Sequence, residues 1–308
     1  MDLVMIIGGL VLLVLAGDAL VRGAVSASVS MGVPAFIVSL VVIGFGTSAP
    51  ELLISVQSAL SGVPGLAIGN VVGSNIANIL LVLGVTVSIS ALVSHEINSR
   101  KPYLQMLLAT LVFIALCFMG PLHYWHGFVL LALLGHMLWS AMREVKNHRA
   151  SCSDDEVLEE PMATWKTTAY LIGGIVGLPL GAQFMVDGAQ GIARDFGISE
   201  EVIGLTLVAI GTSLPELVTA AIAALKNKPE VALGNVLGSN LFNILAIMGV
   251  TAFLGPIPIG EHMLHADLWV MLAAALAIMP FALFKHRMPR FVGVAFLVIY
   301  CGYMISLF

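Results

Sequence analysis

Long apolar runs, separated by short polar stretches, fill almost the whole chain. A helix needs ~20 mainly apolar residues to cross the hydrocarbon core of a bilayer. Ten stretches approach or exceed that length: 3–22, 34–60, 65–93, 103–120, 123–142, 167–190, 200–225, 230–254, 264–284 and 291–307. The pattern predicts an all-α membrane protein with ten transmembrane helices.

One long hydrophilic stretch divides these segments into two groups of five. It carries five acidic residues: Asp154, Asp155, Glu156, Glu159 and Glu160. We expect a first repeat over 1–143, an acidic cytoplasmic linker over 144–166 and a second repeat over 167–308. The linker lacks the spaced ligands and the glycine of an EF-hand loop, so we interpret it as a solvated connection.

The two groups carry the same polar motifs. Gly-Thr-Ser-Ala-Pro-Glu ends at Glu51, and Gly-Thr-Ser-Leu-Pro-Glu ends at Glu216, 165 positions later. Gly-Asn-Val-Val-Gly-Ser-Asn over 69–75 recurs as Gly-Asn-Val-Leu-Gly-Ser-Asn over 234–240, at the same offset. Because each group has an odd number of crossings, the second must enter the membrane from the opposite face. The sequence therefore predicts inverted repeats, which secondary transporters use for alternating access.

Composition narrows the function further. Hydrophobic residues make up 59% of the chain and charged residues 10%, and the mean hydropathy is +1.03. Soluble domains typically carry about 25% charged residues, so we expect lipid to surround this chain. No basic patch indicates nucleic-acid binding. Since there is also no P-loop and no nucleophile–base set, we expect neither an enzyme nor a bound cofactor.

The basic residues predict the orientation. With the N-terminus outside and ten crossings, twelve of the thirteen Lys and Arg residues fall on the inner side. Arg194 is the one on the outer side. Because inner loops are enriched in Lys and Arg, we expect both termini to lie outside a prokaryotic plasma (inner) membrane.

Two glutamates near the middle of their segments carry the candidate chemistry. A carboxylate at mid-bilayer costs on the order of 2.5–3.5 kcal/mol unless something compensates it. No Lys or Arg lies inside any predicted segment, so a bound cation or a proton must do so. Pro50 and Pro215 precede Glu51 and Glu216, and they break the helix hydrogen bonds one turn earlier. The freed carbonyls are hard oxygen ligands, which suit Ca²⁺ and Na⁺.

The second motif adds an oxygen-rich helix face. Asn70, Ser74 and Asn78 are spaced by four residues, as are their counterparts Asn235, Ser239 and Asn243. Single Asn and Ser residues in membrane helices usually bond neighbouring helices. Two duplicated sets beside two duplicated glutamates favour ion coordination. The absence of sulfur and imidazole from the motifs argues against soft metals.

Together the motifs resemble the alpha repeats of the calcium/cation antiporter superfamily, closest to its prokaryotic sodium/calcium exchangers. The resemblance covers the whole chain. It implies ten helices with broken central ones, and two long tilted helices that slide past a four-helix core. It also implies a set of ion ligands: Glu51, Glu216, Thr47, Thr212, Gly44, Ser48, Ser74, Ala209, Ser213, Ser239, Asn78 and Asn243.

We therefore expect a monomeric secondary antiporter that exchanges Ca²⁺ for Na⁺. Members of the potassium-dependent branch have Asp where this chain has Asn243, so we expect exchange without K⁺. Two carboxylates balance one Ca²⁺ but not three Na⁺, which predicts mutually exclusive binding and electrogenic exchange.

Two alternatives stay open. A Ca²⁺/H⁺ antiporter could use the same glutamates, although protons need no cage of Thr, Ser and Asn. A cation channel is the other, although channels usually have an oligomeric pore with a filter.

Overall fold

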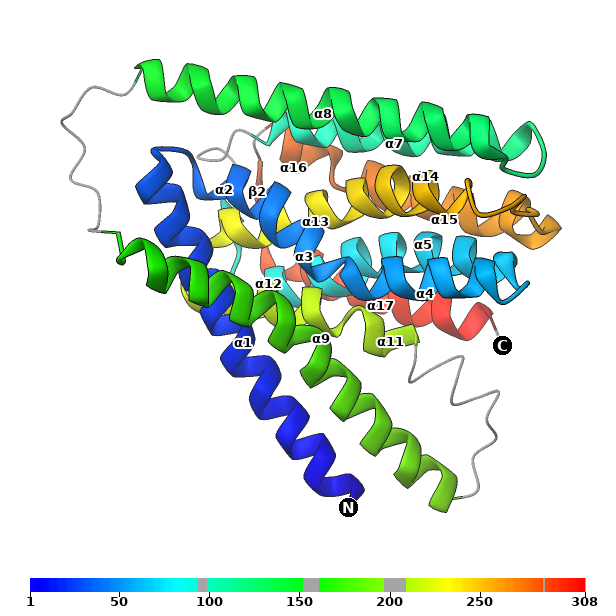
Figure 1. The fold of residues 1–308 in the computed structure, drawn as a ribbon, viewed down its shortest axis with the longest axis horizontal. Coiled ribbons are helices and arrows are strands. Elements are labelled where there is room, and N and C mark those ends of the chain that lie inside the picture. The colour runs from blue at the N-terminus through cyan, green and yellow to red at the C-terminus, as the bar shows by residue number, and fades with distance from the viewer. Residues whose placement is uncertain (94–98, 152–160, 197–208, 285, 308) are drawn as a thin grey trace.

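The computed structural model describes residues 1–93, 99–151, 161–196, 209–284 and 286–307, without the side chains of Val93, 144–151 and 209–210. This part of the chain is almost entirely helical (Figure 1). The one two-stranded sheet within it pairs β1 (Leu92–Val93) with β2 (Arg287–Met288), antiparallel.

Ten helical elements precede the linker. They are α1 (Asp2–Met31), α2 (Ala35–Val38), η1 (Ser39–Ile43), α3 (Gly44–Thr47), α4 (Ala49–Leu60), α5 (Pro64–Ala77), η2 (Asn78–Leu83), α6 (Gly84–Ile89), α7 (Arg100–Phe118) and α8 (Tyr124–Ser151). The η elements are short π-helices that continue directly into the neighbouring α-helices.

The described part of the second half follows the same order. Its elements are α9 (Thr164–Asp195), α11 (Ala209–Thr212), α12 (Leu214–Leu225), α13 (Pro229–Phe242), η5 (Asn243–Ile247), α14 (Met248–Thr251), η6 (Met263–Asp267), α15 (Leu268–Ala277), α16 (Met279–Phe284) and α17 (Arg290–Ser306).

The described residues of every predicted segment are mainly helical; the first part of the seventh, 200–208, lies outside them. Seven helices there are long and apolar enough to cross a membrane, or eight if the pair Ala35–Thr47 and Ala49–Leu60, bent by 40°, is one span. The shorter apolar helices α12 and α17 occupy two further predicted segments. The protein is thus a helical multi-pass membrane protein, and the count of ten crossings stays a prediction.

The predicted end of the first segment was wrong. The first segment, expected to end at residue 22, continues to Met31 and stops where Gly32 adopts a left-handed conformation (φ 61°). Arg22 therefore lies within a helix, where Asp18 pairs with it at 2.6 Å. The predicted linker start also falls inside α8, which continues to Ser151.

The two long helices α1 and α9 lie side by side, antiparallel and oblique to the rest of the bundle (Figure 1). Glycines let their backbones touch: a Cβ at Gly9 would lie 2.6 Å from the carbonyl oxygen of Gly181. A Cβ at Gly188 would lie 2.5 Å from the carbonyl oxygen of Asp2. Small residues drive such close helix pairing in membranes.

The central helices repeat in conformation as well as in sequence. Ser48, with φ −81° and ψ 4°, separates α3 from α4. Ser213, with φ −87° and ψ 1°, separates α11 from α12 in the same way. The helices that follow, α4 and α12, are both 12 residues long and carry proline in the first turn. At the equivalent positions Asn78 and Asn243, both α5 and α13 change into π-helices, which are often found at functional sites.

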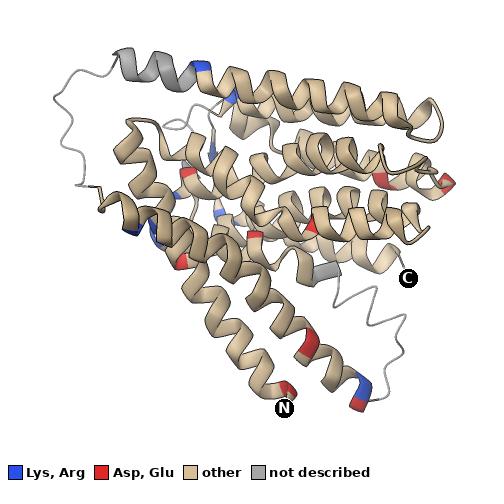
Figure 2. Ribbon diagram, viewed as in Figure 1, with Lys and Arg blue, Asp and Glu red and all other residues tan. Residues whose placement is uncertain are grey.

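Charge is distributed unevenly along the bundle. Figure 2 shows most Lys and Arg residues of the described chain gathered at one end, with both termini towards the other. Acidic residues also occur in the middle of the bundle (Figure 2).

Candidate functional site

The two glutamates predicted to carry the chemistry are fully buried. Glu51 is 1% exposed and Glu216 is 0% exposed. Each lies in the first turn of its helix, directly after the break at Ser48 or Ser213. Neither oxygen of either carboxylate has a hydrogen-bond partner among the residues described. Because a buried carboxylate without a partner is costly, both side chains need a bound cation or a proton to compensate them.

The carboxylates meet at the interface between the two halves. They lie close enough for their charges to interact. Thr47, from the first half, donates a hydrogen bond to Asn235 Oδ1 at 3.1 Å. The hydroxyls of Thr47 and Ser239 also approach the Glu216 carboxylate, without reaching normal hydrogen-bond geometry. One buried acid from each half therefore lies at this interface, and a shared ion between the two carboxylates stays a prediction.

Four asparagines form a reciprocal network across this interface. Asn75 Nδ2 donates to the carbonyl oxygen of Asn240 at 3.3 Å, and Asn240 Nδ2 donates to that of Asn75 at 3.4 Å. Asn78 Nδ2 donates to Asn240 Oδ1, and Asn243 Nδ2 to Asn75 Oδ1, both at 3.1 Å. With their NH₂ groups held in this way, Asn78 and Asn243 keep buried side-chain oxygens that no described residue bonds.

A second pair of asparagines supports the helices that carry the acids. Asn70 Nδ2 donates to the backbone carbonyl of Glu51 at 3.1 Å, and Asn235 Nδ2 donates to that of Glu216 at 3.4 Å. Both residues therefore link the two helices of their own half. They act on the position of each glutamate and need not touch an ion.

The unpartnered oxygens come as matched sets from the two halves. They are four carboxylate oxygens of Glu51 and Glu216 and two amide oxygens of Asn78 and Asn243. All four side chains are buried, at 1% exposure or less. Ca²⁺ takes 6–8 oxygen ligands and favours carboxylate and carbonyl groups, so these groups have the chemistry of a calcium site.

The other predicted ligands surround this centre. Ser48 is buried and its hydroxyl has no partner within the described chain, and Ser213 is buried at the equivalent break. The Ser239 hydroxyl donates to the carbonyl oxygen of Gly44 at 3.3 Å. That approach depends on glycine, because a Cβ at Gly44 would lie 2.8 Å from the backbone of Gly238. Ala209 begins α11, and its side chain is outside the description.

One cavity reaches predicted ligands from the side. It measures about 350 Å³ and is lined by Asn70, Ser74 and Thr212, together with residues of η6 and α17. Among these is Asp267, which the motifs did not indicate because it lies in the second repeat but outside the repeated motifs. The hydropathy pattern placed it near the outer end of an apolar segment, where a lone Asp gives little signal.

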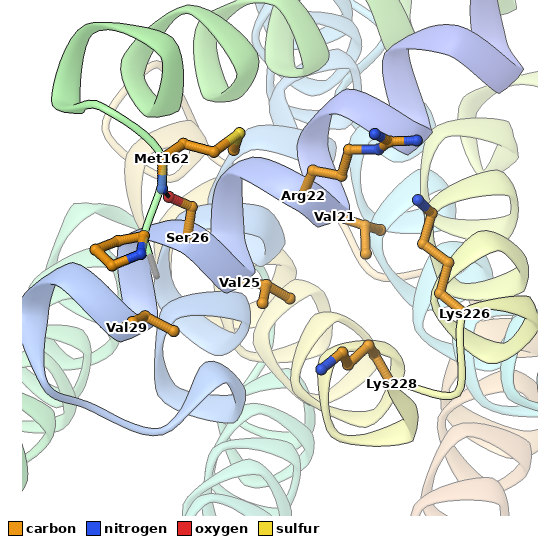
Figure 3. A pocket seen from close by; sticks show the side chains of 9 residues that line it. Val21, Arg22, Val25, Ser26, Val29, Met162, Lys226 and Lys228 are labelled. Atoms are coloured by element: carbon orange, nitrogen blue, oxygen red, sulfur yellow. Dashed lines mark hydrogen bonds between the residues drawn. The ribbon is translucent and has the colours of Figure 1, made fainter. Parts of the chain in front are cut away.

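A second cavity, of about 420 Å³, is lined by basic side chains. Arg22, Lys226 and Lys228 line it together with apolar residues such as Val25 (Figure 3). Lys226 and Arg22 both pair with Asp18. Three cations against one carboxylate would repel a metal ion, so this cavity is not a candidate cation site.

The chain is similar to sodium/calcium exchangers over almost its whole length. Residues 1–142 and 166–308 match the family described as "Sodium/calcium exchanger protein". It is 31% identical to the sodium/calcium exchanger MaX1 of Methanosarcina acetivorans, over 97% of this chain and 96% of that protein. It is 34% identical to the inner membrane protein YrbG of Escherichia coli, over 88% of this chain and 86% of the other.

A solved structure of the sodium-calcium exchanger NCX_Mj, soaked with zero Na⁺ and Ca²⁺, has the same fold. The TM-score is 0.86 at 33% sequence identity, covering 100% of this chain and 99% of that one.

Proposed function

Since this chain belongs to the sodium/calcium exchanger family, a family of membrane transporters, we propose that it moves Ca²⁺ out of the cytoplasm in exchange for Na⁺ by alternating access. The observation that carries the proposal is the set of unpartnered oxygens at the interface of the two halves. No Lys or Arg side chain is recorded as pairing with either buried glutamate in the described chain, so a cation is the partner that the site requires.

Ca²⁺ would bind between Glu51 and Glu216, with the oxygens of Asn78 and Asn243 completing the centre. Two carboxylates balance its charge, and the amide oxygens supply neutral ligands. The backbone carbonyls of Thr47 and Thr212, next to the helix breaks, are further candidates. The calcium site would then contain equivalent residues of the two halves.

Na⁺ would occupy positions around this centre. The hydroxyls of Ser74 and Ser239 lie on the helices that lead to Asn78 and Asn243, and those of Ser48 and Ser213 lie at the breaks before the glutamates. The carbonyls of Gly44 and Ala209 lie one turn before these breaks. Several Na⁺ would share the two carboxylates that Ca²⁺ also needs, so each ion set would have to leave before the other binds.

Three observations support ten crossings in two inverted repeats. The reciprocal bonds between Asn75 and Asn240 are what a two-fold relation between the halves produces, since each residue makes the contact that its counterpart makes. Both termini lie towards one end, as an even number of crossings requires (Figure 1). The basic residues gather at the opposite end, which would be the cytoplasmic side (Figure 2).

The charge of the site favours electrogenic exchange without K⁺. Among the described residues, the unpartnered carboxylates at the proposed ion site are those of Glu51 and Glu216, and Asn78 and Asn243 are neutral. A bound Ca²⁺ therefore leaves no negative charge for a K⁺ beside it. Exchange of three Na⁺ for one Ca²⁺ would move one net charge in each cycle.

The test is ⁴⁵Ca²⁺ uptake by liposomes that contain the purified protein. Uptake should require an opposing Na⁺ gradient and should continue without K⁺. In a separate experiment, its rate should change when a K⁺ gradient and valinomycin set the membrane potential. Uptake driven by a proton gradient without Na⁺ would instead favour Ca²⁺/H⁺ exchange. Calcium-dependent current that does not saturate would favour a channel.

A further inference from the structure

Asp267 is a third buried carboxylate in the membrane-spanning part of the chain, and it belongs to neither repeat motif. It ends the π-helix η6 and is 8% exposed. Its Oδ1 accepts a hydrogen bond from the Tyr303 hydroxyl at 3.0 Å, and its Oδ2 lies 3.0 Å from His262 Nδ1. An ionisable residue within a membrane segment is costly and usually serves a function.

The position of Asp267 connects it to the candidate ion site. It lines the same cavity of about 350 Å³ as Asn70, Ser74 and Thr212. Asn70 bonds the backbone of Glu51, and Thr212 lies one turn before Glu216. Asp267 is the one carboxylate recorded in the described lining of this cavity. Tyr300, Tyr303 and Met304 of α17, with Leu307 directly after it, form another part of that lining.

We propose that Asp267 is a staging site for cations, which holds Ca²⁺ or Na⁺ electrostatically in the cavity before the ion passes Ser74 and Thr212 to the buried glutamates. The proposal rests on the proposed exchange function. Tyr303 and His262 fix the carboxylate in place, and each of its oxygens retains a lone pair for a hydrated ion. Negative charge in a cleft with low-dielectric walls raises the local concentration of cations.

A staging role predicts an effect on one face of the membrane. The cavity lies beside the last turn of α17, on the side of the C-terminus. Removing the charge should weaken ion capture from that side. It should leave capture from the opposite side and the maximal rate unchanged, because the central ligands are intact. The effect should also be larger for Ca²⁺ than for Na⁺, because the Coulomb energy doubles with the charge of the ion.

The experiment compares Asp267→Asn with the wild type in membrane vesicles of both orientations. The half-saturating Ca²⁺ concentration on the C-terminal face should rise about three- to tenfold, the size expected for one unit charge acting on a hydrated ion several ångströms away. The half-saturating Na⁺ concentration on that face should rise by about the square root of the factor for Ca²⁺, because Na⁺ carries half the charge. Added inert salt should reduce both shifts, since it screens the charge.

Two further variants separate the charge from a structural role. Tyr303→Phe removes the hydroxyl but keeps the carboxylate, so its half-saturating Ca²⁺ should change less than twofold. Asp187→Asn removes a carboxylate of α9 that is bonded to Gln183 and is not recorded in the cavity lining, so it should have no effect.

Three results would each overturn the staging role. The half-saturating Ca²⁺ concentration of Asp267→Asn could equal that of the wild type, or it could shift equally on both faces. The shift for Tyr303→Phe could also be as large as that for Asp267→Asn. Absence of Na⁺–Ca²⁺ exchange by the wild type would instead overturn the proposed function itself.

Discussion

Replacing Glu216 with glutamine removes one of two buried charges while keeping the shape of the side chain. Two unit charges 4 Å apart at an effective dielectric constant of 20 attract by about 4 kcal/mol, and a divalent ion doubles this to about 8 kcal/mol. Against this stands the cost of burying the carboxylate in the empty site, several kcal/mol for one ion. If that cost is about 4 kcal/mol, the variant loses about 8 kcal/mol of attraction and regains about 4 kcal/mol of burial cost. Ca²⁺ binding therefore weakens by about 4 kcal/mol, or roughly a thousandfold.

Sodium should respond differently to the same change. Its Coulomb term is about 4 kcal/mol, which the relief of carboxylate burial nearly cancels. Glu216→Gln should therefore lose Ca²⁺ affinity far more than Na⁺ affinity. The free protein should also become more stable without metal, because no described residue bonds either oxygen of Glu216 and the variant no longer buries that charge.

The assay is calcium titration by isothermal calorimetry in detergent, with thermal unfolding followed at chelated calcium and at increasing NaCl. Glu261→Gln, which changes an exposed glutamate, is the matched control. Wild-type calcium affinity in Glu216→Gln, or equal losses for Ca²⁺ and Na⁺, would refute the assignment of this carboxylate as a shared ligand. A lower unfolding temperature without metal would show that Glu216 has a stabilising partner in the protein.

Four other substitutions test the packing and the charge of the site. Gly238→Ala should reduce the free energy of unfolding by about 3 kcal/mol, the upper end for overpacking, because its Cβ would clash with the Leu40 carbonyl oxygen. Its repeat counterpart Gly73→Ala, with no described atom within 4 Å, should leave stability unchanged or raise it by up to about 1 kcal/mol in thermal unfolding. Asn243→Asp should make ⁴⁵Ca²⁺ flux respond to K⁺, because a third carboxylate can balance a monovalent ion; an unchanged K⁺ response would count against the two-charge site. Asn240→Leu should lower both transport rate and unfolding temperature, since it removes two side-chain hydrogen bonds across the halves, to Asn78 and to the Asn75 carbonyl; normal flux would show that these bonds are dispensable.

Hydropathy located the helices, because a membrane span is long and its apolar composition is hard to mimic. It could not locate their ends. The first helix continues past Arg22 because Asp18 neutralises that side chain and because the following residues, such as Ala24 and Ser26, are small enough to pack against a neighbour. The Ser26 hydroxyl bonds Thr167 of α9 at 2.7 Å, a contact that exists only in the folded protein.

The repeated motifs identified the acids and the residues around them, because a buried carboxylate without a basic partner is conspicuous in an apolar sequence. The different roles of the asparagines could not be predicted from the motifs. Asn70 and Asn78 share one helix face by spacing, yet Asn70 bonds a backbone carbonyl while Asn78 keeps a free oxygen. Asn75 and Asn240 were not predicted as site residues, since their partners lie in the other half of the chain.

The glycine contacts indicate which parts of the protein can move relative to each other. Within the α1–α9 pair, Gly9 meets backbone atoms of Gly181, and within the core Gly44 meets backbone atoms of Gly238. Between the pair and the core, the glycines meet side chains instead. Gly46 faces Ile175, and a Cβ there would lie 2.7 Å from Ile175 Cγ1. Side chains can change rotamer while backbones in contact cannot, so the softest interface lies between α1–α9 and the core. The proposed ligands, which all lie in the core segments, would then keep their geometry if the long helices slide past them.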